Sequence, residues 1–242
     1  MIPRPAGSSP KAQHRALAPS WVAIAVVSVV FLFSQPCLAE DLQMTFEDTS
    51  PGQLPSGWTV AATHAGRVLA TWAVEAAATA HGGRNVLSLT EPGAQSLVQR
   101  VVGSDTYNLC WTAAARLADV DLEVALCGNA GRLDQGGGPI WRAQDANNYY
   151  VARYNPLERN LRVYFVKDGN RVQLASAEGL AVRTGEWFTI RVVHRGTTIQ
   201  AYLNGVRLIE VDDRTLTAAG GVGVWTKADA ATSFDDFRVR GL

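Results

Sequence analysis

Short runs of β-forming residues recur along the chain after residue 40, and turn-forming residues separate them. No helical periodicity of useful length appears in the same region. Many short strands at intervals of roughly 8–12 residues are typical of an all-β sandwich or barrel. The expected strands are residues 71–74, 85–90, 96–102, 106–113, 119–126, 139–143, 148–155, 161–167, 172–177, 186–195, 198–203, 206–211, 221–226 and 233–240.

Residues 1–39 have the three parts of a secretory signal peptide. A basic part that ends at Arg15 precedes an apolar run at 21–33, and small residues lead to an expected cleavage after Ala39. The apolar run is shorter than the roughly 20 residues of a membrane helix, although a retained anchor is the alternative. We expect an exported protein, periplasmic or extracellular, in which residues 40–242 form one domain that leaves the membrane after cleavage.

Removing the signal peptide takes away three of the 22 Lys and Arg residues and none of the 22 Asp and Glu residues, which leaves a net charge of −3. Without a basic run beyond the signal, nucleic acid is not an expected partner. The histidines have no metal-ligand spacing, and nucleophile elbows, phosphate loops and dinucleotide fingerprints do not occur. The sequence therefore predicts no cofactor, and it leaves the oligomeric state open.

Two cysteines, Cys110 and Cys127, remain after cleavage of the signal. In an exported chain a pair of cysteines suggests one disulfide, which would contribute about 3 kcal/mol by closing a short loop. Both cysteines are equally compatible with small buried side chains. Simple alternation does not decide between these two interpretations.

The run from Trp141 to Arg153 reads as a strand, a polar turn and a second strand. On the second strand, alternation places Tyr149 and Arg153 on one face and Tyr150 on the other. Aromatic rings can pack against the C–H faces of sugars, and planar polar groups can bind hydroxyl groups. The same residues could instead brace the sheet and satisfy amides in the turn.

A neighbouring strand adds Arg162 and Tyr164 on one face, so the two strands could form a single polar and aromatic patch. An arginine cluster of this kind would favour an acidic sugar or another carboxylate. Packing between neighbouring strands is the alternative. The candidate ligand contacts are Trp141, Arg142, Asp145, Asn148, Tyr149, Arg153, Arg162 and Tyr164.

Near the C-terminus, Trp225, Lys227 and Asp229 lie at the expected end of a strand and could form the rim of a ligand site. The carboxylates of Asp229, Asp235 and Asp236 are weak candidates for Ca²⁺ ligands. No calcium-loop spacing supports them, and an ordinary turn is the alternative. We expect no metal site here.

The second half of the chain, from about 119 to 239, resembles bacterial laminin-G-like modules of the concanavalin A-like lectin/glucanase superfamily. Some members of that group are described as family-16-type glycoside hydrolases or 3-keto-disaccharide hydrolases. The segments that carry the resemblance are 136–153 (GGGPIWRAQDANNYYVAR), 155–158, 162–164, 185–187, 223–229 and 234–236. The resemblance implies a two-sheet antiparallel jelly-roll β-sandwich, with sugars bound on the concave sheet face or its rim. It says less about function, because the superfamily contains lectins, enzymes and structural modules.

Three acids, Asp119, Asp121 and Glu123, share one face of an expected strand. Family-16 glycosidases carry a similar acidic motif, but their first position is Glu. Residues four apart on a flat strand are about 13 Å apart, whereas a retaining mechanism needs carboxyl groups about 5.5 Å apart. The acids are therefore weak catalytic candidates, and a solvated strand face is the alternative.

The sequence favours an exported, non-catalytic carbohydrate-binding β-sandwich whose partner is a saccharide or glycan. A glycoside hydrolase or a 3-keto-glycoside hydrolase is the second hypothesis. A module that recognises other proteins is the third.

Overall fold

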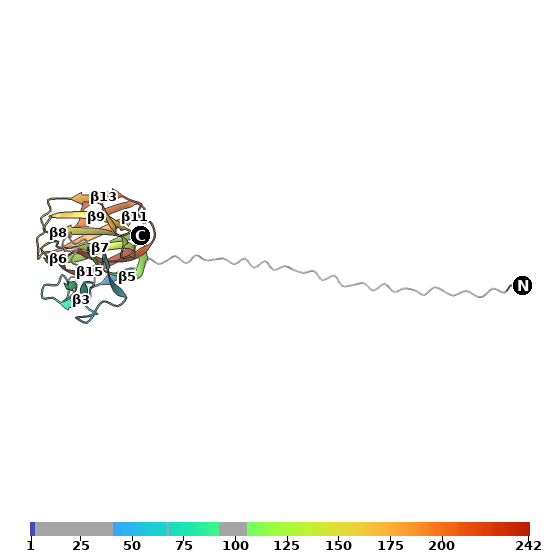
Figure 1. The fold of residues 1–242 in the computed structure, drawn as a ribbon, viewed down its shortest axis with the longest axis horizontal. Coiled ribbons are helices and arrows are strands. Elements are labelled where there is room, and N and C mark those ends of the chain that lie inside the picture. The colour runs from blue at the N-terminus through green and yellow to red at the C-terminus, as the bar shows by residue number, and fades with distance from the viewer. Residues whose placement is uncertain (3–40, 67, 92–105) are drawn as a thin grey trace. The chain divides into compact units, whose positions relative to one another are not determined.

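The computed structural model describes residues 1–2, 41–66, 68–91 and 106–242, and its strands belong to one compact unit, Leu38–Leu242 (Figure 1). Two predictions fall outside these residues. They are the signal peptide, of which only the first two residues are described, and the strand expected at 96–102.

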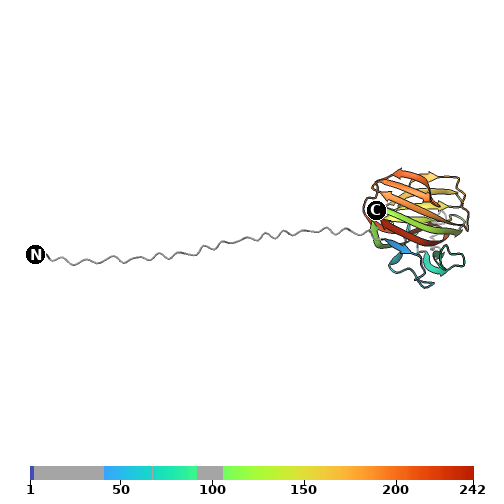
Figure 2. The same ribbon diagram turned by 180° about the vertical axis from the view of Figure 1, so that it is seen from behind.

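The described elements are β-strands in two antiparallel sheets. In spatial order, the eight-stranded sheet contains β13 (Val206–Asp212), β12 (Thr198–Leu203), β11 (Trp187–Arg195), β6 (Val120–Ala130), β15 (Ala231–Gly241), β4 (Asn85–Glu91) and β3 (Thr71–Ala76), with β1 (Leu42–Met44) paired to β15. The seven-stranded sheet contains β10 (Asn170–Ala177), β9 (Asn160–Lys167), β8 (Asn148–Asn155), β7 (Gly138–Asp145), β14 (Gly220–Lys227), β5 (Tyr107–Leu117) and β2 (Trp58–Thr63). Figure 2 shows the orange strands of the first sheet beside the green β6 and the dark red β15. The described part of the chain contains no helix that could cross a membrane.

The prediction of an all-β sandwich is confirmed, and the strands expected within the described residues are present. Two strands were not predicted from the sequence. β1 has only three residues, too few to show a pattern, and β2 follows a loop rich in Pro and Gly that hides its start.

The main core lies between the sheets and follows from alternation. On β6, Val120, Leu122 and Val124 are fully buried while Asp121 and Glu123 remain partly exposed. The facing side chains of the other sheet belong to the same cluster. This separation of apolar and charged faces is the pattern expected for a sheet with one covered side.

One side of the seven-stranded sheet faces the main core, and we call its opposite side the outer face. A second apolar cluster lies on this outer face. The cluster contains Tyr107, Leu109, Ile140, Ala143, Tyr149, Val151, Tyr164, Val166 and Trp225. On β8, Tyr149 and Val151 belong to this cluster, whereas Tyr150 and Ala152 belong to the main core. The predicted alternation of the strand at 148–155 is therefore confirmed.

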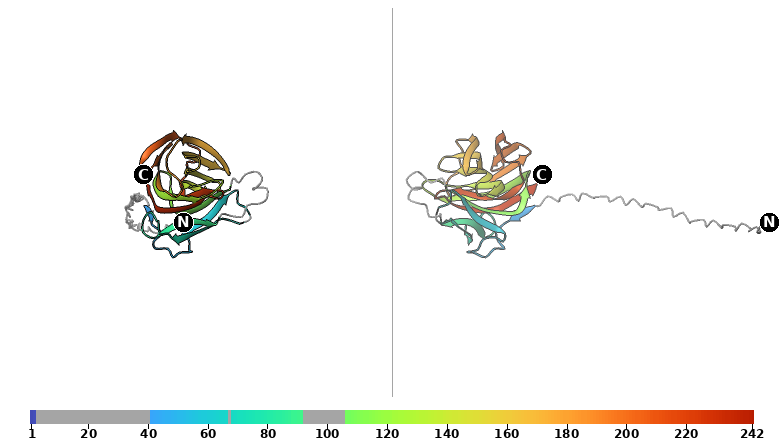
Figure 3. Two further views of the ribbon diagram at one scale, coloured as in Figure 1. Left: turned by 90° about the vertical axis from the view of Figure 1, so that its left-hand side faces the viewer. Right: turned by 45° about the vertical axis from the view of Figure 1, so that its right-hand side comes forward.

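The outer face is strongly concave. Five strand spacings separate β10 from β5 in the sheet order, roughly 24 Å if the sheet were flat. Yet the guanidinium carbon of Arg171 on β10 lies 4.8 Å from the centre of the Tyr107 ring on β5. Thr63 on β2 likewise hydrogen-bonds the Tyr149 hydroxyl on β8 across 2.8 Å, four spacings away. Opposite corners of the sheet thus fold toward each other, and the curvature of the strands is visible in Figure 3.

The two cysteines do not form a disulfide. Cys110 points from the seven-stranded sheet into the main core. Cys127 follows the core residue Leu126 on β6 of the eight-stranded sheet. Its side chain therefore points to the side of that sheet that faces away from the main core. Of the two interpretations left open by the sequence, the structure favours the buried thiols, and burial raises the pKa of both.

Reductant should therefore leave the thermal midpoint of unfolding unchanged, because it has no bond to break. A scan with and without reductant checks this. If a bridge closed the 110–127 loop, reduction would instead remove about 3 kcal/mol of stability.

Candidate functional site

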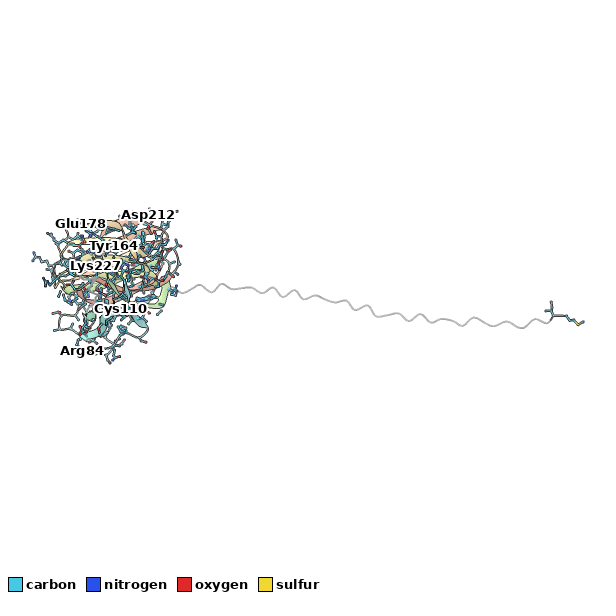
Figure 4. All side chains as sticks on the ribbon, viewed as in Figure 1. Arg84, Cys110, Tyr164, Glu178, Asp212 and Lys227 are labelled. Carbon is cyan, nitrogen blue, oxygen red and sulfur yellow. The ribbon has the colours of Figure 1, made fainter. Side chains whose placement is uncertain are left out.

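The outer face brings together several residues that the sequence identified. Register pairs Arg153 on β8 with Arg162 on β9 and Val151 with Tyr164, so these side chains share the face that carries Tyr149. Trp225 and Lys227 on β14 join them, because Lys227 pairs with Tyr107 and Trp225 with Leu109. Figure 4 labels Tyr164, Lys227 and Glu178, which follows β10.

The aromatic rings at the centre of this face are tied to each other. The Tyr149 hydroxyl accepts a hydrogen bond from the Trp225 indole at 3.1 Å and shares a second one with Thr63. Burial raises the pKa of Tyr149, which is fully enclosed. Tyr149 therefore forms the floor of the face and does not present a ring to solvent.

A group of charged residues lies on and beside the outer face, and we call it the polar cluster. Its members are Asp134, Arg153, Glu158, Arg162 and Lys227. Arg153 is buried and donates to Glu158 at 2.9 Å, and the same carboxylate lies 3.1 Å from Arg162. Lys227 lies 3.7 Å from Asp134. Charge-assisted contacts of this kind hold planar donors in fixed positions.

The pKa values of the two carboxylates in the polar cluster are shifted in opposite directions. Burial raises the pKa of Asp134, although the charges of Arg153 and Lys227 oppose it. Burial also acts to raise the pKa of Glu158, but the hydrogen bond and charge of Arg153 outweigh it and hold that pKa below its usual range. Glu158 therefore stays ionised, whereas Asp134 takes up a proton more readily.

Trp111 on β5 is a flat, partly exposed ring on the same face. It pairs with Gly223 on β14. A Cβ at Gly221 would lie 2.7 Å from Cε3 and Cζ3 of the indole, and one at Gly223 would lie 2.5 Å from the Trp111 Cβ. Because the two glycines have no side chain, the Trp111 ring can pack directly on the backbone of the neighbouring strand.

The structure moves Trp141 and Arg142 away from the outer face. Trp141 is fully buried in the main core, where it stacks on Tyr150 with ring centres 5.6 Å apart and donates to His194 at 2.9 Å. Arg142 has a positive φ of 48° at a break in the pairing of β7. Neither side chain is therefore available to a ligand on the outer face.

Arg142 has a structural role instead. Its guanidinium donates to backbone carbonyl groups, among them that of Leu216 at 2.8 Å and that of Gly196 at 3.0 Å, and it pairs with Asp119 at 3.3 Å. With these donors satisfied and only 2% of the residue exposed, it ties three loops together.

Asp145 and Asn148 organise turns. The Asp145 carboxylate accepts from the amide of Asn147 at 2.7 Å, and Asn148 accepts from the amide of Asp168 at 3.1 Å. These contacts correspond to the alternative that the sequence left open, in which the polar residues satisfy turn amides.

Asp121 and Glu123 lie on β6 of the other sheet, apart from the polar cluster. Asp119 does not belong to the expected strand, because it lies in the turn before β6 and accepts from Arg142 and from the amide of Gly196. Asp121 binds Arg191 at 2.6 Å and Arg240 at 2.7 Å, while Glu123 binds Arg238 at 2.7 Å. The hydrogen bond from Arg191 is the largest of the effects that lower the pKa of Asp121. A general acid needs the opposite shift, so these contacts do not suit a catalytic pair.

Asp229 contacts a different loop from the other two weak calcium candidates, Asp235 and Asp236, which both contact the turn at residues 81–82. Asp229 accepts hydrogen bonds from the amides of residues 132–134. Asp235 accepts from the amide of Gly82, and Asp236 contacts His81. Within the described ranges, no group of three or more His, Cys, Asp or Glu side chains is arranged to hold a metal ion.

Sequence reasoning missed Trp111, Asp134, Glu158 and Arg171 as members of this face. The glycines opposite Trp111 were a usable signal, since small residues two apart on a strand leave room for a ring from a neighbour. Arg171 had no such signal, because only the curvature of the sheet brings it to Tyr107.

No protein-family model matches this chain, and neither does any curated protein. Among solved structures, the carbohydrate-binding module CBM66 from Bacillus subtilis has a TM-score of 0.56 at 19% identity, covering 76% of this chain and 95% of the module. The cellulose-induced protein Cip1 has a TM-score of 0.56 at 12% identity, with 82% and 96% covered. A Bacillus subtilis protein of unknown function with a galectin-like fold has a TM-score of 0.50 at 11% identity, with 76% and 88% covered.

At these identities the comparisons establish the fold. The chain is an all-β, two-sheet antiparallel jelly-roll β-sandwich, consistent with the concanavalin A-like class that the resemblance implied.

Proposed function

We propose that this protein binds a saccharide on the outer face of its seven-stranded sheet. One observation carries the proposal: a single concave face combines a partly exposed indole with a cluster of fixed planar donors. Trp111 offers a flat apolar surface to the C–H side of a sugar ring. Arg162 and Lys227, both partly exposed, offer donors for hydroxyl groups.

The similarity to a carbohydrate-binding module supports this proposal at the level of the fold. We further propose that the protein acts outside the cytoplasm, in the periplasm or extracellular space, because its N-terminal sequence has the pattern of a signal peptide.

Replacing Trp111 with alanine should weaken saccharide binding about tenfold, because the lost stacking contact is worth on the order of 1.4 kcal/mol. Affinity electrophoresis in gels that contain neutral or acidic polysaccharides measures the effect. Trp187→Ala is the matched control, since Trp187 is also partly exposed but lies on the other sheet. Parent-like retention of Trp111→Ala would exclude this ring as a contact, and a parent that binds no polysaccharide would contradict the function.

A glycoside-processing activity is the second candidate, and the polar cluster is the reason. Two carboxylates with pKa values pushed apart are the usual arrangement of a general acid and an ionised partner. Here Asp134 would be the acid and Glu158 the ionised group. Incubation with glycosides and oxidised disaccharides tests for turnover, and any turnover that survives Asp134→Asn would remove this residue from the mechanism.

A further inference from the structure

Arg171, near the start of β10, is held on the outer face by aromatic rings. Its guanidinium carbon lies 4.6 Å from the centre of the Tyr164 ring, 4.8 Å from that of Tyr107 and 5.9 Å from that of Trp225. Cation–π contacts at these distances orient a guanidinium group, but they supply no acceptor for its N–H groups.

The other arginines of this face already have carboxylate partners. Arg153 binds Glu158, and Arg162 contacts both Glu158 and Glu178. Arg171, in contrast, has no ion pair with any residue that the structure describes, and its Nη1 has no hydrogen-bond partner. A partly buried arginine without an acceptor is unfavourable, so an anion at this position would stabilise it.

A second unfilled donor lies on the same face. The Nε of Arg153 also has no hydrogen-bond partner among the described residues, although this side chain is only 2% exposed and its other nitrogens bind Asn160 and Glu158. Two strands, β8 and β10, thus each contribute one guanidinium donor that no acceptor in the described part of the chain satisfies.

We propose that the saccharide bound on the outer face is acidic and that its carboxylate binds Arg171. This proposal rests on the saccharide-binding function proposed above and names its ligand class. A guanidinium group recognises a carboxylate through paired N–H···O bonds, which a neutral hydroxyl group does not reproduce. The aromatic rings around Arg171 hold it in place before the ligand arrives, which reduces the entropy lost on binding.

The test compares two forms of one ligand, tri-galacturonate and the same trimer with its carboxyl groups reduced to alcohols. Titration calorimetry on the full chain should show at least tenfold tighter binding of the acidic form, and added salt should weaken that preference. Arg171→Gln should remove the preference. Arg207→Gln is the matched control, because Arg207 pairs with Glu210 on the other sheet, and it should keep the preference.

Each outcome bears on one part of the proposal. Equal binding of both trimers by the parent overturns the acidic ligand and leaves saccharide binding intact, whereas binding of neither trimer nor of any polysaccharide overturns the proposed function itself. A preference that survives Arg171→Gln overturns the role of Arg171. Acetate that displaces the trimer at equal concentration overturns the saccharide as the source of the carboxylate. If Arg171→Gln does not fold, Arg171→Lys should still lower the preference severalfold, and an unchanged preference contradicts the proposal.

Discussion

Replacing Trp141 with alanine is expected to lower the free energy of unfolding by about 3–5 kcal/mol, as is typical when a buried aromatic side chain is truncated. The indole is fully enclosed between the sheets, so its removal leaves a cavity that the stacked Tyr150 ring cannot fill by itself. The change also takes away the donor to Nδ1 of His194, a fully buried group. Urea denaturation measures the loss as a lower midpoint with an unchanged slope.

Trp111→Ala provides the comparison that separates the two roles of tryptophan in this chain. Trp111 is partly exposed and rests on glycines, so its removal should cost less than half as much stability while it weakens saccharide binding. If Trp141→Ala kept full stability and lost ligand affinity, Trp141 would have to reach the surface, and the position of the main core would be in error.

Acid should destabilise the protein through His194. Burial, followed by the charge of Arg142, lowers the pKa of this imidazole to about 4 in the folded state, against about 6.5 in an unfolded chain. Between these values the unfolded chain binds a proton that the folded chain excludes. Stability is therefore complete above about pH 6.5 and is lost as the pH falls toward about 4, by on the order of 3 kcal/mol.

Comparison with His194→Gln isolates this effect in urea denaturation curves recorded from pH 7 to pH 4. The variant should be less stable at pH 7 but should lose less stability as the pH falls. Asp134 and Asp235 contribute with the opposite sign, because burial raises their pKa values, but they do so in both proteins. His81→Gln is the control and should keep the acid loss that His194 causes, since it leaves His194 and its contact with Trp141 in place. A parent and a His194→Gln variant with parallel pH profiles would contradict the assignment.

The strand pattern was predictable because alternation is local. Tyr149 and Tyr150 were assigned to opposite faces from sequence alone, and the structure confirms that assignment. What alternation does not reveal is which face a partner sheet covers or how strongly a sheet curves. Both aromatic faces of β8 are buried, one by the other sheet and one by the concave outer face itself.

Two irregularities explain most of the remaining differences between the faces predicted from the sequence and those in the structure. The left-handed backbone at Arg142 interrupts the pairing of β7 with β8. Residues after Arg142 therefore do not lie on the faces that simple alternation from Trp141 predicts. The approach of Arg171 to Tyr107 depends on residues 64 positions apart in the chain meeting across a curved sheet. No pattern within either strand predicts the contact between Arg171 and Tyr107.

The hydrogen bond between Thr63 and Tyr149 also matters for how the molecule behaves among copies of itself. Among the strands that the structure describes, β2 is the last of its sheet, and an outermost strand normally leaves a row of unpaired amides and carbonyls that can recruit another chain. Here the end of β2 is drawn inward, because Thr63 is anchored to Tyr149 and to the carbonyl of Ala146. A bent and tethered border is a poor template for intermolecular pairing, so the same curvature that shapes the outer face also discourages aggregation.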